Sequence, residues 1–385
     1  MKLFGNKSGT APDAPAITEA AVLNALRGVI DPDLHRDVVE LGFIKDIKIC
    51  EGAVGFTMEL TTPACPVKEK LKAAAHDLVA AIPGVTQVNV HMTAQVRQST
   101  DPWAQRAPVP GVRNIVAVAS GKGGVGKSTV AVNLAVALAR QGARVGLMDA
   151  DIYGPSIPMM MGVQDARVMG DADGHILPLE AHGVKIVSIG FILGENAPVM
   201  WRGPMVGKAV TQLVRECVWG DLDYLVIDLP PGTGDAQLSL AQTVPLSGGV
   251  IVTTPQDIAL LDATRGLSMF REVKVPVLGI VENMSYFACP HCGEKTNIFS
   301  HGGGREAAER MKVPFLGEIP LDVDVRIGGD VGLPITAAKP ESPQAVAFME
   351  LASKVAAAVS IAAMDQQVQA EGFIPLNTLV GPRAA

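Results

Sequence analysis

The chain has 385 residues, which is long enough for two domains and a large hydrophobic core. Its formal net charge of -7 argues against a basic surface that binds nucleic acid over the whole protein. No uninterrupted apolar run reaches the ~18 residues that suggest a membrane-spanning helix. Five cysteines, an odd number, do not form a recognisable disulfide framework in a chain of this length. We therefore expect neither nucleic acid nor a membrane among its partners.

The N-terminal residues 1–15 are polar and contain several prolines and glycines. They lack the apolar stretch that a secretory signal peptide requires. We expect them to form a disordered lead-in, and we expect a cytoplasmic protein.

Residues 16–92 have the pattern of a small domain. Thr18 is suited to cap a helix that runs to about Val29. The elements expected after it are strands over 44–49 and 54–60, a helix over 66–81 and a strand over 85–92. The order α-β-β-α-β predicts a small α+β domain. Residues 93–112, which carry three prolines and no periodicity, are predicted to form a linker.

Residues 113–363 alternate between strand and helix patterns. The expected strands are 114–119, 144–149, 184–189, 224–228, 249–254, 277–282 and 315–319. Several are continuous apolar runs, which are typical of parallel strands buried on both faces. Residues 343–363 are expected to form a closing helix, and the tail 364–385 has no clear assignment. The sequence therefore predicts an α/β fold, a mostly parallel sheet with helices on both faces, preceded by a small α+β domain.

Residues 120–129 read SGKGGVGKST, which contains the phosphate-binding pattern G-x-x-x-x-G-K-[ST] of P-loop NTPases. An apolar run precedes the pattern and a helical stretch follows it, as this motif requires. Backbone N–H groups and the helix dipole would then face a triphosphate. We expect Lys127 to contact the outer phosphates and Ser128 to bind Mg²⁺. The residues expected to bind ATP here are Gly121, Lys122, Gly123, Gly124, Val125, Gly126, Lys127, Ser128 and Thr129.

Lys122 is a second lysine near the start of this loop. It resembles the signature lysine of the deviant Walker A ATPases, the class that includes MinD, ParA and the nitrogenase iron protein. In that class the lysine crosses a dimer interface to the nucleotide of the partner subunit, so the resemblance implies a homodimer. The alternative is an ordinary solvated lysine.

Two acidic segments follow predicted strands. Asp228 ends an apolar strand and is suited to hold Mg²⁺ as a Walker B carboxylate, and Gly232 is suited to offer a backbone N–H to the γ-phosphate. Asp149 and Asp151 follow another strand at positions i and i+2. We expect Asp149 to serve Mg²⁺ and Asp151 to orient the attacking water. The alternative for this pair is that it only forms a turn.

Cys289 and Cys292 stand in the sequence CPHCG, where the glycine permits a tight turn. Two thiols at this spacing can bind one metal, but a tetrahedral sulfur site needs four ligands. A two-fold dimer would supply four thiolates, enough for a [4Fe–4S] cluster or for zinc. A redox dithiol and a purely structural role remain open. We expect His291, between the cysteines, not to be a ligand.

Cys65 lies in TTPACPV, directly before a predicted helix. A helix N-terminus can lower the pKa of a thiol and make it a ligand or a nucleophile. The alternative is a small buried residue at a helix start. We expect Cys50 and Cys217 to be core residues.

Six ordered motifs resemble those of the Mrp-type iron–sulfur cluster carrier ATPases. They are GKGGVGKST at 121–129, LMDADIYGPSIP at 147–158, VIDLPPGTGD at 226–235, TTPQDIALLDATRG at 253–266, ENMSYFACPHCG at 282–293 and GEIPLD at 317–322. Residues 16–92 resemble the small domain of iron–sulfur assembly factors. The resemblance implies a homodimer that hydrolyses ATP and holds a labile [4Fe–4S] cluster. It also implies cluster scaffold proteins and apo iron–sulfur proteins as partners.

The resemblance implies roles in ATP binding and hydrolysis for the residues of this chain that match the family's motifs. Lys122 matches the signature lysine. Lys127 and Ser128 match the phosphate and Mg²⁺ contacts, Asp151 matches the water-orienting carboxylate, and Asp228 matches the Walker B residue.

Further positions match the cluster site and the base of the nucleotide. Cys289 and Cys292 match the cluster ligands. Asn283 stands where related ATPases contact adenine, and Pro320 and Asp322 are expected to flank the same base.

Three other classes share some of these features. A MinD- or ParA-like positioning ATPase needs a surface-binding element, such as a basic amphipathic C-terminal helix, and residues 343–363 hold one lysine. A nitrogenase-reductase-like protein has its two ligands far apart in sequence. A regulatory ATPase stapled by zinc is the remaining alternative.

Overall fold

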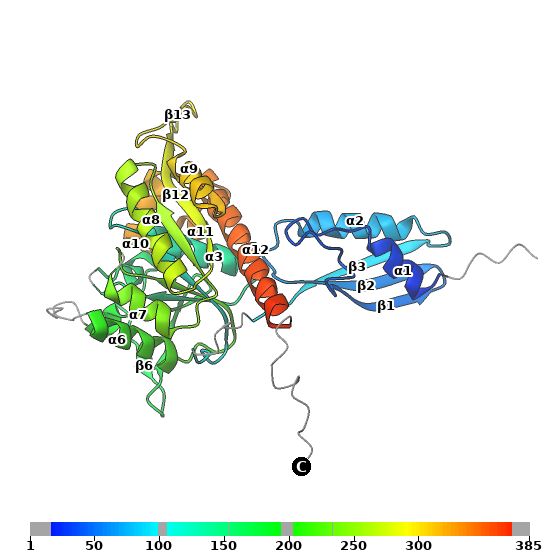
Figure 1. Cartoon of the computed structure of the whole chain (residues 1–385), viewed down its shortest axis with the longest axis horizontal. Coiled ribbons are helices and arrows are strands. Elements are labelled where there is room, and N and C mark those ends of the chain that lie inside the picture. Colours follow the sequence, from blue (N-terminus) through cyan, green and yellow to red (C-terminus); the bar gives the residue numbers. More distant parts are fainter. Residues whose placement is uncertain (1–16, 99–105, 153, 194–202, 233, 372–385) are drawn as a thin grey trace, which may run out of the picture. The chain divides into compact units, whose positions relative to one another are not determined.

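The computed structural model describes residues 17–98, 106–152, 154–193, 203–232 and 234–371 (Figure 1). The chain divides into two compact units, residues 1–95 and 96–385. The predicted lead-in 1–15 and most of the predicted tail lie outside the described residues.

The N-terminal unit has the predicted order α-β-β-α-β. Its elements are α1 (Glu19–Leu26), β1 (Ile44–Cys50), β2 (Ala53–Leu60), α2 (Lys68–Ala80) and β3 (Gln87–Ala94). β2 pairs antiparallel with β1 and parallel with β3. The Thr18 side chain caps α1 by accepting a hydrogen bond from the Ala21 N–H, as the sequence predicts. The helix ends at Leu26, three residues before the expected end at Val29.

The C-terminal unit is built on a nine-stranded sheet in the described part of the chain (Figure 1). The strand order is β13-β12-β11-β4-β10-β5-β9-β8, with β14 beside β12. The strands are β4 (Val112–Ala119), β5 (Val145–Asp149), β8 (Leu179–Ala181), β9 (Val184–Ser188), β10 (Leu222–Asp228), β11 (Gly248–Thr253), β12 (Val277–Ala288), β13 (Lys295–Thr296) and β14 (Phe315–Leu321). All seven predicted strands are present and parallel. The short β8 and β13 pair antiparallel at the edges and were not predicted.

Helices connect these strands. They are α3 (Lys127–Arg140), α4 (Ile157–Met160), α5 (Gly190–Leu193), α6 (Gly203–Glu216), α7 (Asp235–Thr243), α8 (Asp257–Glu272), α9 (Gly303–Met311), α10 (Val323–Val331), α11 (Ile335–Ala338) and α12 (Pro343–Glu371). A small hairpin, β6 (Met169–Gly170) and β7 (Ile176–Leu177), stands apart from the main sheet.

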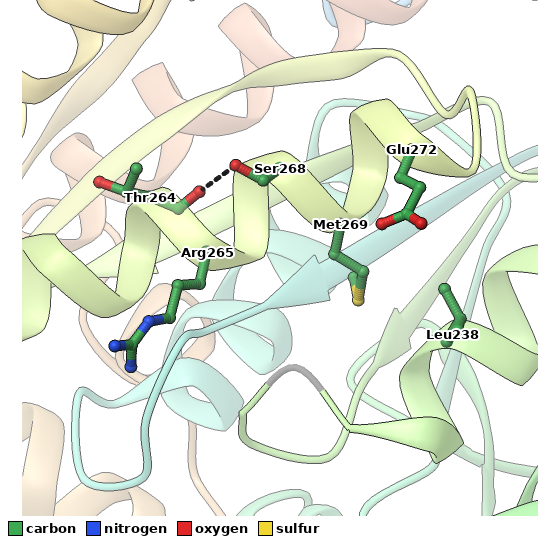
Figure 2. Close-up of a pocket in the computed structure, with 6 residues that line it drawn as sticks. All are labelled: Leu238, Thr264, Arg265, Ser268, Met269 and Glu272. Carbon is green, nitrogen blue, oxygen red and sulfur yellow. Dashed lines mark hydrogen bonds between the residues drawn. The ribbon is translucent and has the colours of Figure 1, made fainter.

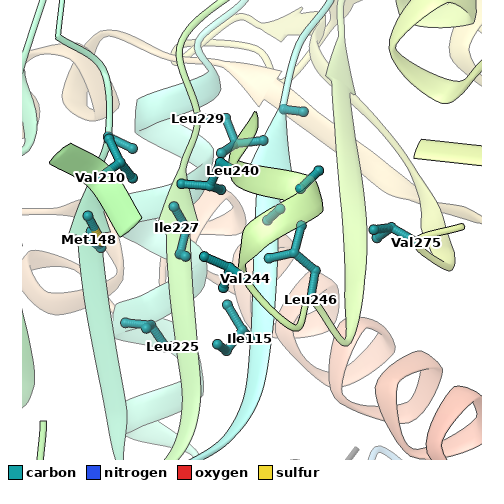
Figure 3. Packing of buried hydrophobic residues seen from close by; sticks show 14 of the residues in the cluster. Ile115, Met148, Val210, Leu225, Ile227, Leu229, Leu240, Val244, Leu246 and Val275 are labelled. Carbon is teal, nitrogen blue, oxygen red and sulfur yellow. The ribbon is translucent and has the colours of Figure 1, made fainter. Parts of the chain in front are cut away.

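Helices cover both faces of the sheet, as predicted, because alternate residues of each buried strand point to opposite sides. Ile115 and Ile227 pack with Leu240 and Val244 of α7 in a buried cluster to which α6, α8 and α9 also contribute (Figure 3). On the other face α3 packs against β4, β5 and β10, and α12 packs against α3.

The apolar helix α12 runs to Glu371, eight residues beyond the expected end at 363. Its segment Pro343–Asp365 is long and apolar enough to cross a membrane, with a mean hydropathy of 1.6. Its buried side chains, which include Phe348, Leu351 and Val355, are part of the core. Packing against α3 and β14 buries part of this apolar helix.

The structure differs from the predicted linker over 93–112. Residues 93–94 belong to β3, and β4 begins at Val112. Between them, Val96 and Val109 are buried, and Arg106 donates to the Val273 carbonyl. The composition of residues 93–112 does not reveal these contacts with distant segments. The prediction of a longer linker therefore depended on the prolines alone. Residues 99–105 lie outside the described part.

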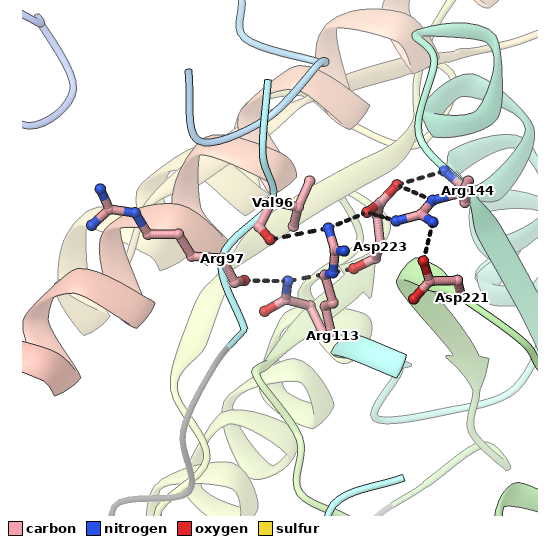
Figure 4. A network of polar contacts seen from close by, with 7 residues as sticks. Val96, Arg97, Arg113, Arg144, Asp221 and Asp223 are labelled. Carbon is pink, nitrogen blue, oxygen red and sulfur yellow. Dashed lines mark hydrogen bonds and ion pairs between the residues drawn. The ribbon is translucent and has the colours of Figure 1, made fainter. Parts of the chain in front are cut away.

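A charged network lies at the start of β4, β5 and β10 (Figure 4). Asp223 accepts hydrogen bonds from the side chains of Arg113 and Arg144, at 3.1 and 2.9 Å to its Oδ1 atom. The Arg113 side chain also donates to the Val96 carbonyl, and Arg144 reaches the exposed Asp221. The arginines lower the pKa of the Asp223 carboxyl, against the opposing effect of burial.

We expect Asp223→Ala to lower the free energy of unfolding by about 1.5–3 kcal/mol, because the buried carboxylate accepts charge-assisted hydrogen bonds from Arg113 and Arg144 that the variant loses. Asp221→Ala is the matched control. Its side chain is 67% exposed, and an exposed pair contributes about 0–1 kcal/mol. Denaturant unfolding of both variants measures the difference. Equal effects of the two changes would contradict a structural role for the buried pair.

Candidate functional site

The predicted phosphate-binding loop lies between β4 and α3, at the carboxyl end of the parallel sheet. α3 begins at Lys127, inside the motif itself. Gly126 has φ 77°, in the left-handed region that favours glycine. Gly121 is required for space, because a Cβ there would lie 2.1 Å from the Asp262 carbonyl carbon. The loop is therefore held closely by α8, which carries Asp262.

Asn283 packs directly against this loop. Its Nδ2 atom donates a hydrogen bond of 2.9 Å to the Val125 carbonyl, and a Cβ on Gly126 would lie 2.2 Å from the same atom. The fold thus places Asn283 on the phosphate-binding loop, although it lies 158 residues from Val125 in the sequence. Its contact with adenine stays a prediction.

Lys127 is buried together with two of the predicted carboxylates. Its Nζ atom donates to Asp228 Oδ1 at 2.6 Å and lies 3.7 Å from Asp151 Oδ2. It also donates to Ser128 Oγ at 3.3 Å. The sequence placed these residues in separate motifs, and the sheet brings them to one point because β4, β5 and β10 are adjacent.

Asp228 has the properties of a Mg²⁺-binding carboxylate. It is fully buried, and burial raises its pKa while the Lys127 ammonium opposes that rise. Its Oδ2 atom has no hydrogen-bond partner among the described residues. A hard cation prefers such an oxygen, and Ser128 lies next to Lys127 in the same cluster. The residues present therefore fit the predicted Mg²⁺ ion.

The Asp149 carboxylate accepts hydrogen bonds mainly from backbone N–H groups. Its carboxylate accepts hydrogen bonds from the Asp151 N–H at 3.1 Å, the Ile157 N–H at 3.2 Å and the Ser188 hydroxyl at 3.1 Å. Burial and the nearby Asp228 charge raise its pKa. These contacts hold the loop that carries Asp151. A direct role for Asp149 at Mg²⁺ stays a prediction, and the donors already present favour a positioning role.

Lys122 points to a different partner from Lys127. Its Nζ atom donates to Gln256 Oε1 at 3.5 Å, at the start of α8. Lys127 is 6% exposed, whereas Lys122 is partly exposed. The two lysines of the loop therefore differ in both burial and contacts.

Three further predicted residues lie at the ends of strands. The Gly232 N–H donates to the Ser120 carbonyl at 3.0 Å, so its predicted phosphate contact requires that bond to open. Pro320 is buried near the end of β14. Asp322 caps α10 by accepting a hydrogen bond of 2.7 Å from the Asp324 N–H, a role that its position before a helix could have indicated.

The two cysteines of the CPHCG sequence form a hairpin between β12 and β13. Cys289 is half-buried and Cys292 is exposed. The Cys289 N–H donates to the Glu294 carbonyl at 2.9 Å, and the Gly293 N–H donates to the Cys289 carbonyl at 2.8 Å. The backbone N–H groups of Cys292 and His291 lower the pKa of the Cys289 thiol. A stabilised thiolate on a tight hairpin is suited to bind a metal.

The other cysteines differ in part from expectation. Burial raises the pKa of the half-buried Cys65 thiol, and α2 begins three residues later, so of the two interpretations of Cys65 the structure favours a partly buried residue before a helix start over an activated thiol. Cys50 is exposed at the end of β1, so its prediction as a core residue is wrong. Cys217 is buried, as predicted, and burial raises its pKa to about 12.

A separate groove of about 310 Å³ lies between α7 and α8 (Figure 2). Its lining residues are Leu238, Thr264, Arg265, Ser268, Met269 and Glu272. None of the predicted site residues lines it, so the groove is distinct from the nucleotide loop and the cysteine hairpin.

Family models match segments of both units of the chain. Residues 111–356 match a family model described as NUBPL iron-transfer P-loop NTPase, and residues 19–90 match one described as iron-sulfur cluster assembly protein. An iron-sulfur cluster carrier protein from Synechocystis is 50% identical over 352 residues, 90% of this chain and 99% of that protein. One from Deinococcus radiodurans is 49% identical over 346 residues, 90% and 97% of the two chains.

Two solved structures share the fold of the C-terminal unit. A nucleotide-binding protein from Archaeoglobus fulgidus in complex with ADP has a TM-score of 0.54 at 40% identity, over 61% of this chain and 91% of that chain. The cell division ATPase MinD from Pyrococcus furiosus has a TM-score of 0.50 at 25% identity, over 63% and 98%.

The parallel sheet, the phosphate-binding loop and the buried Lys127–Asp228 pair define a P-loop NTPase with the architecture of MinD. The family match covers most of the chain, and the relatives are similar over nearly their whole length. The chain belongs to the family of iron-transfer P-loop NTPases, with an iron–sulfur cluster assembly domain at its N-terminal side. The resemblance to the Mrp-type carriers is thereby confirmed.

Proposed function

We propose that this protein carries a labile [4Fe–4S] cluster to apo iron–sulfur proteins and that it binds and hydrolyses ATP in doing so. The observation that carries the proposal is the hairpin of Cys289 and Cys292, which extends β12 of a P-loop NTPase domain. The names of the Synechocystis and Deinococcus relatives support the carrier role. Cluster scaffold proteins and apoproteins are the proposed partners in the cytoplasm.

The cluster is proposed to sit between two copies of the chain. Each copy offers two closely spaced thiols in the hairpin, and a four-iron cluster takes four thiolates. The exposed position of Cys292 supports a shared site, because a partner must be able to approach the hairpin. An exposed site also favours release of the cluster, which a donor requires.

The ATP chemistry is proposed to use the buried polar residues around Lys127 at the phosphate-binding loop. Lys127 contacts the outer phosphates in place of Asp228, and Lys122 contacts the nucleotide of the partner subunit. Ser128 and Asp228 hold Mg²⁺, which neutralises phosphate charge when bound. Asp151, held by the Asp149 contacts, orients the attacking water. The ADP complex of the Archaeoglobus relative supports a nucleotide at this loop.

We expect Asp151→Asn to lower turnover by about 100-fold while nucleotide affinity changes little. The reason is that general-base or water-orienting groups contribute ~10²–10⁴ in rate and act mainly in the transition state. Steady-state kinetics and nucleotide titration measure the two effects. Normal turnover with weakened binding would instead assign Asp151 to the Mg²⁺ site.

The test of the proposed function is iron and sulfide analysis of anaerobically prepared protein, followed by transfer of the cluster to an apoprotein. The expected result is about four irons and four sulfides per dimer. Stoichiometric zinc without sulfide would contradict the carrier function and favour a zinc-stapled regulatory ATPase. Absence of any metal at the thiols would favour a MinD- or ParA-like positioning ATPase.

A further inference from the structure

One strand, β12, connects the phosphate-binding loop to the cysteine hairpin. Asn283, in its middle, donates to the Val125 carbonyl of the loop at 2.9 Å. Cys289 follows directly after its last residue, Ala288. The strand pairs with β11 only as far as Glu282, so its second half extends beyond that neighbour toward the hairpin. A single short segment therefore contacts both sites.

Glu282 is a fully buried carboxylate in this segment, and it ties both ends of the hairpin together. It accepts the Ser285 hydroxyl at 2.5 Å on the strand that enters the hairpin. It also accepts the N–H groups of Gly302 at 3.3 Å and Gly304 at 2.6 Å, where the chain leaves the hairpin and α9 begins. A carboxylate at a helix N-terminus is stabilised by the helix dipole.

At Met284 the backbone departs from the extended strand conformation, which makes a local bend in β12 where its pairing with β14 is also irregular. Met284 has φ 55°, a left-handed conformation that a residue with a side chain adopts only when its surroundings hold it. Its Cε atom lies 3.4 Å from the position that a Cβ on Gly126 would take. The bend is thus held on one side by the phosphate-binding loop and on the other by Glu282.

We propose that Glu282, Asn283 and Met284 form a hinge through which nucleotide in the phosphate-binding loop changes the metal affinity of the cysteine hairpin. A shift of Val125 moves Asn283 and Met284, and the bonds of Glu282 pass that movement to Ser285 and to the start of α9. Glu282 is a positioning residue in this scheme. The inference rests on the proposed function for its metal site, and linkage requires that metal change nucleotide affinity by the same factor.

The test is a titration of the full chain with Co²⁺, whose absorption reports its bonds to thiolates, with and without a saturating non-hydrolysable ATP analogue. We expect nucleotide to change the Co²⁺ affinity by about 5-fold or more in the native protein, the lower range of allosteric coupling. In Glu282→Gln the ratio should fall to near one. Glu306→Gln, which removes an exposed carboxylate from the first turn of the same helix, should keep the native ratio.

The ratio separates coupling from mere support of the hairpin, because a purely structural loss lowers Co²⁺ affinity equally with and without nucleotide. Asn283→Ala tests the other end of the hinge and remains informative if Glu282→Gln does not fold. A native ratio of one, or an unchanged ratio in both variants, would overturn the proposal. Nucleotide-dependent Co²⁺ binding in a protein that takes up no cluster would support the hinge and contradict the carrier function.

Discussion

Cys289→Ala and Cys292→Ala are each expected to abolish binding of the reconstituted cluster and its transfer to an apoprotein. The two thiols of one chain are half of the proposed ligand set, and losing one from each chain leaves two thiolates for a cluster that takes four. Iron should fall from about two atoms per chain to near zero. ATP should still bind, because the loop at 120–129 is a separate site on another strand end.

Cys50→Ala is the matched control, because Cys50 is also exposed but lies in the N-terminal unit. Iron, sulfide and native mass are measured beside nucleotide binding in all three variants. A cluster retained in the double Cys289 and Cys292 variant, or about four irons per chain in the native protein, would refute the shared site. Attention would then turn to Cys65.

The second large effect concerns the two lysines of the phosphate-binding loop. Lys127→Ala is expected to weaken ATP binding by about 100-fold, because hydrogen bonds to charged groups contribute ~1.5–3 kcal/mol each. Lys122→Ala should leave binding nearly unchanged and lower turnover by ~10³–10⁵, the range known for an arginine that stabilises transition-state charge from a neighbouring subunit. Nucleotide titration and single-turnover kinetics separate the two outcomes.

Lys127→Ala also leaves the buried Asp228 without its 2.6 Å partner, so thermal unfolding of this variant must be measured beside its binding. Gln256→Ala is the control for Lys122, because it removes the contact at 3.5 Å that holds this lysine on its own chain. Near-native turnover in Lys122→Ala would rule out its action on the partner's nucleotide.

The sequence by itself determined the seven parallel strands of the main sheet, the phosphate-binding loop and the cysteine pair. Each depends on a pattern within about a dozen residues: an apolar run for a buried strand, glycines and a lysine before a helix, two thiols around a turn. The continuous apolar strands also predicted the parallel sheet with helices on both faces. Local patterns of this kind survive in the fold because hydrophobic burial and backbone geometry act on them directly.

The tertiary structure decided which polar groups meet. Lys127 and Asp228 are 101 residues apart in sequence, and only the pairing order of β4 and β10 brings them to 2.6 Å. The tertiary structure also places Asn283 on the phosphate-binding loop. It likewise gives both carboxylate oxygens of Asp149 a hydrogen-bond donor. A sequence motif predicts which residue type stands at the end of a strand. The hydrogen-bond partners of that residue depend on its burial and on the register of the neighbouring strands.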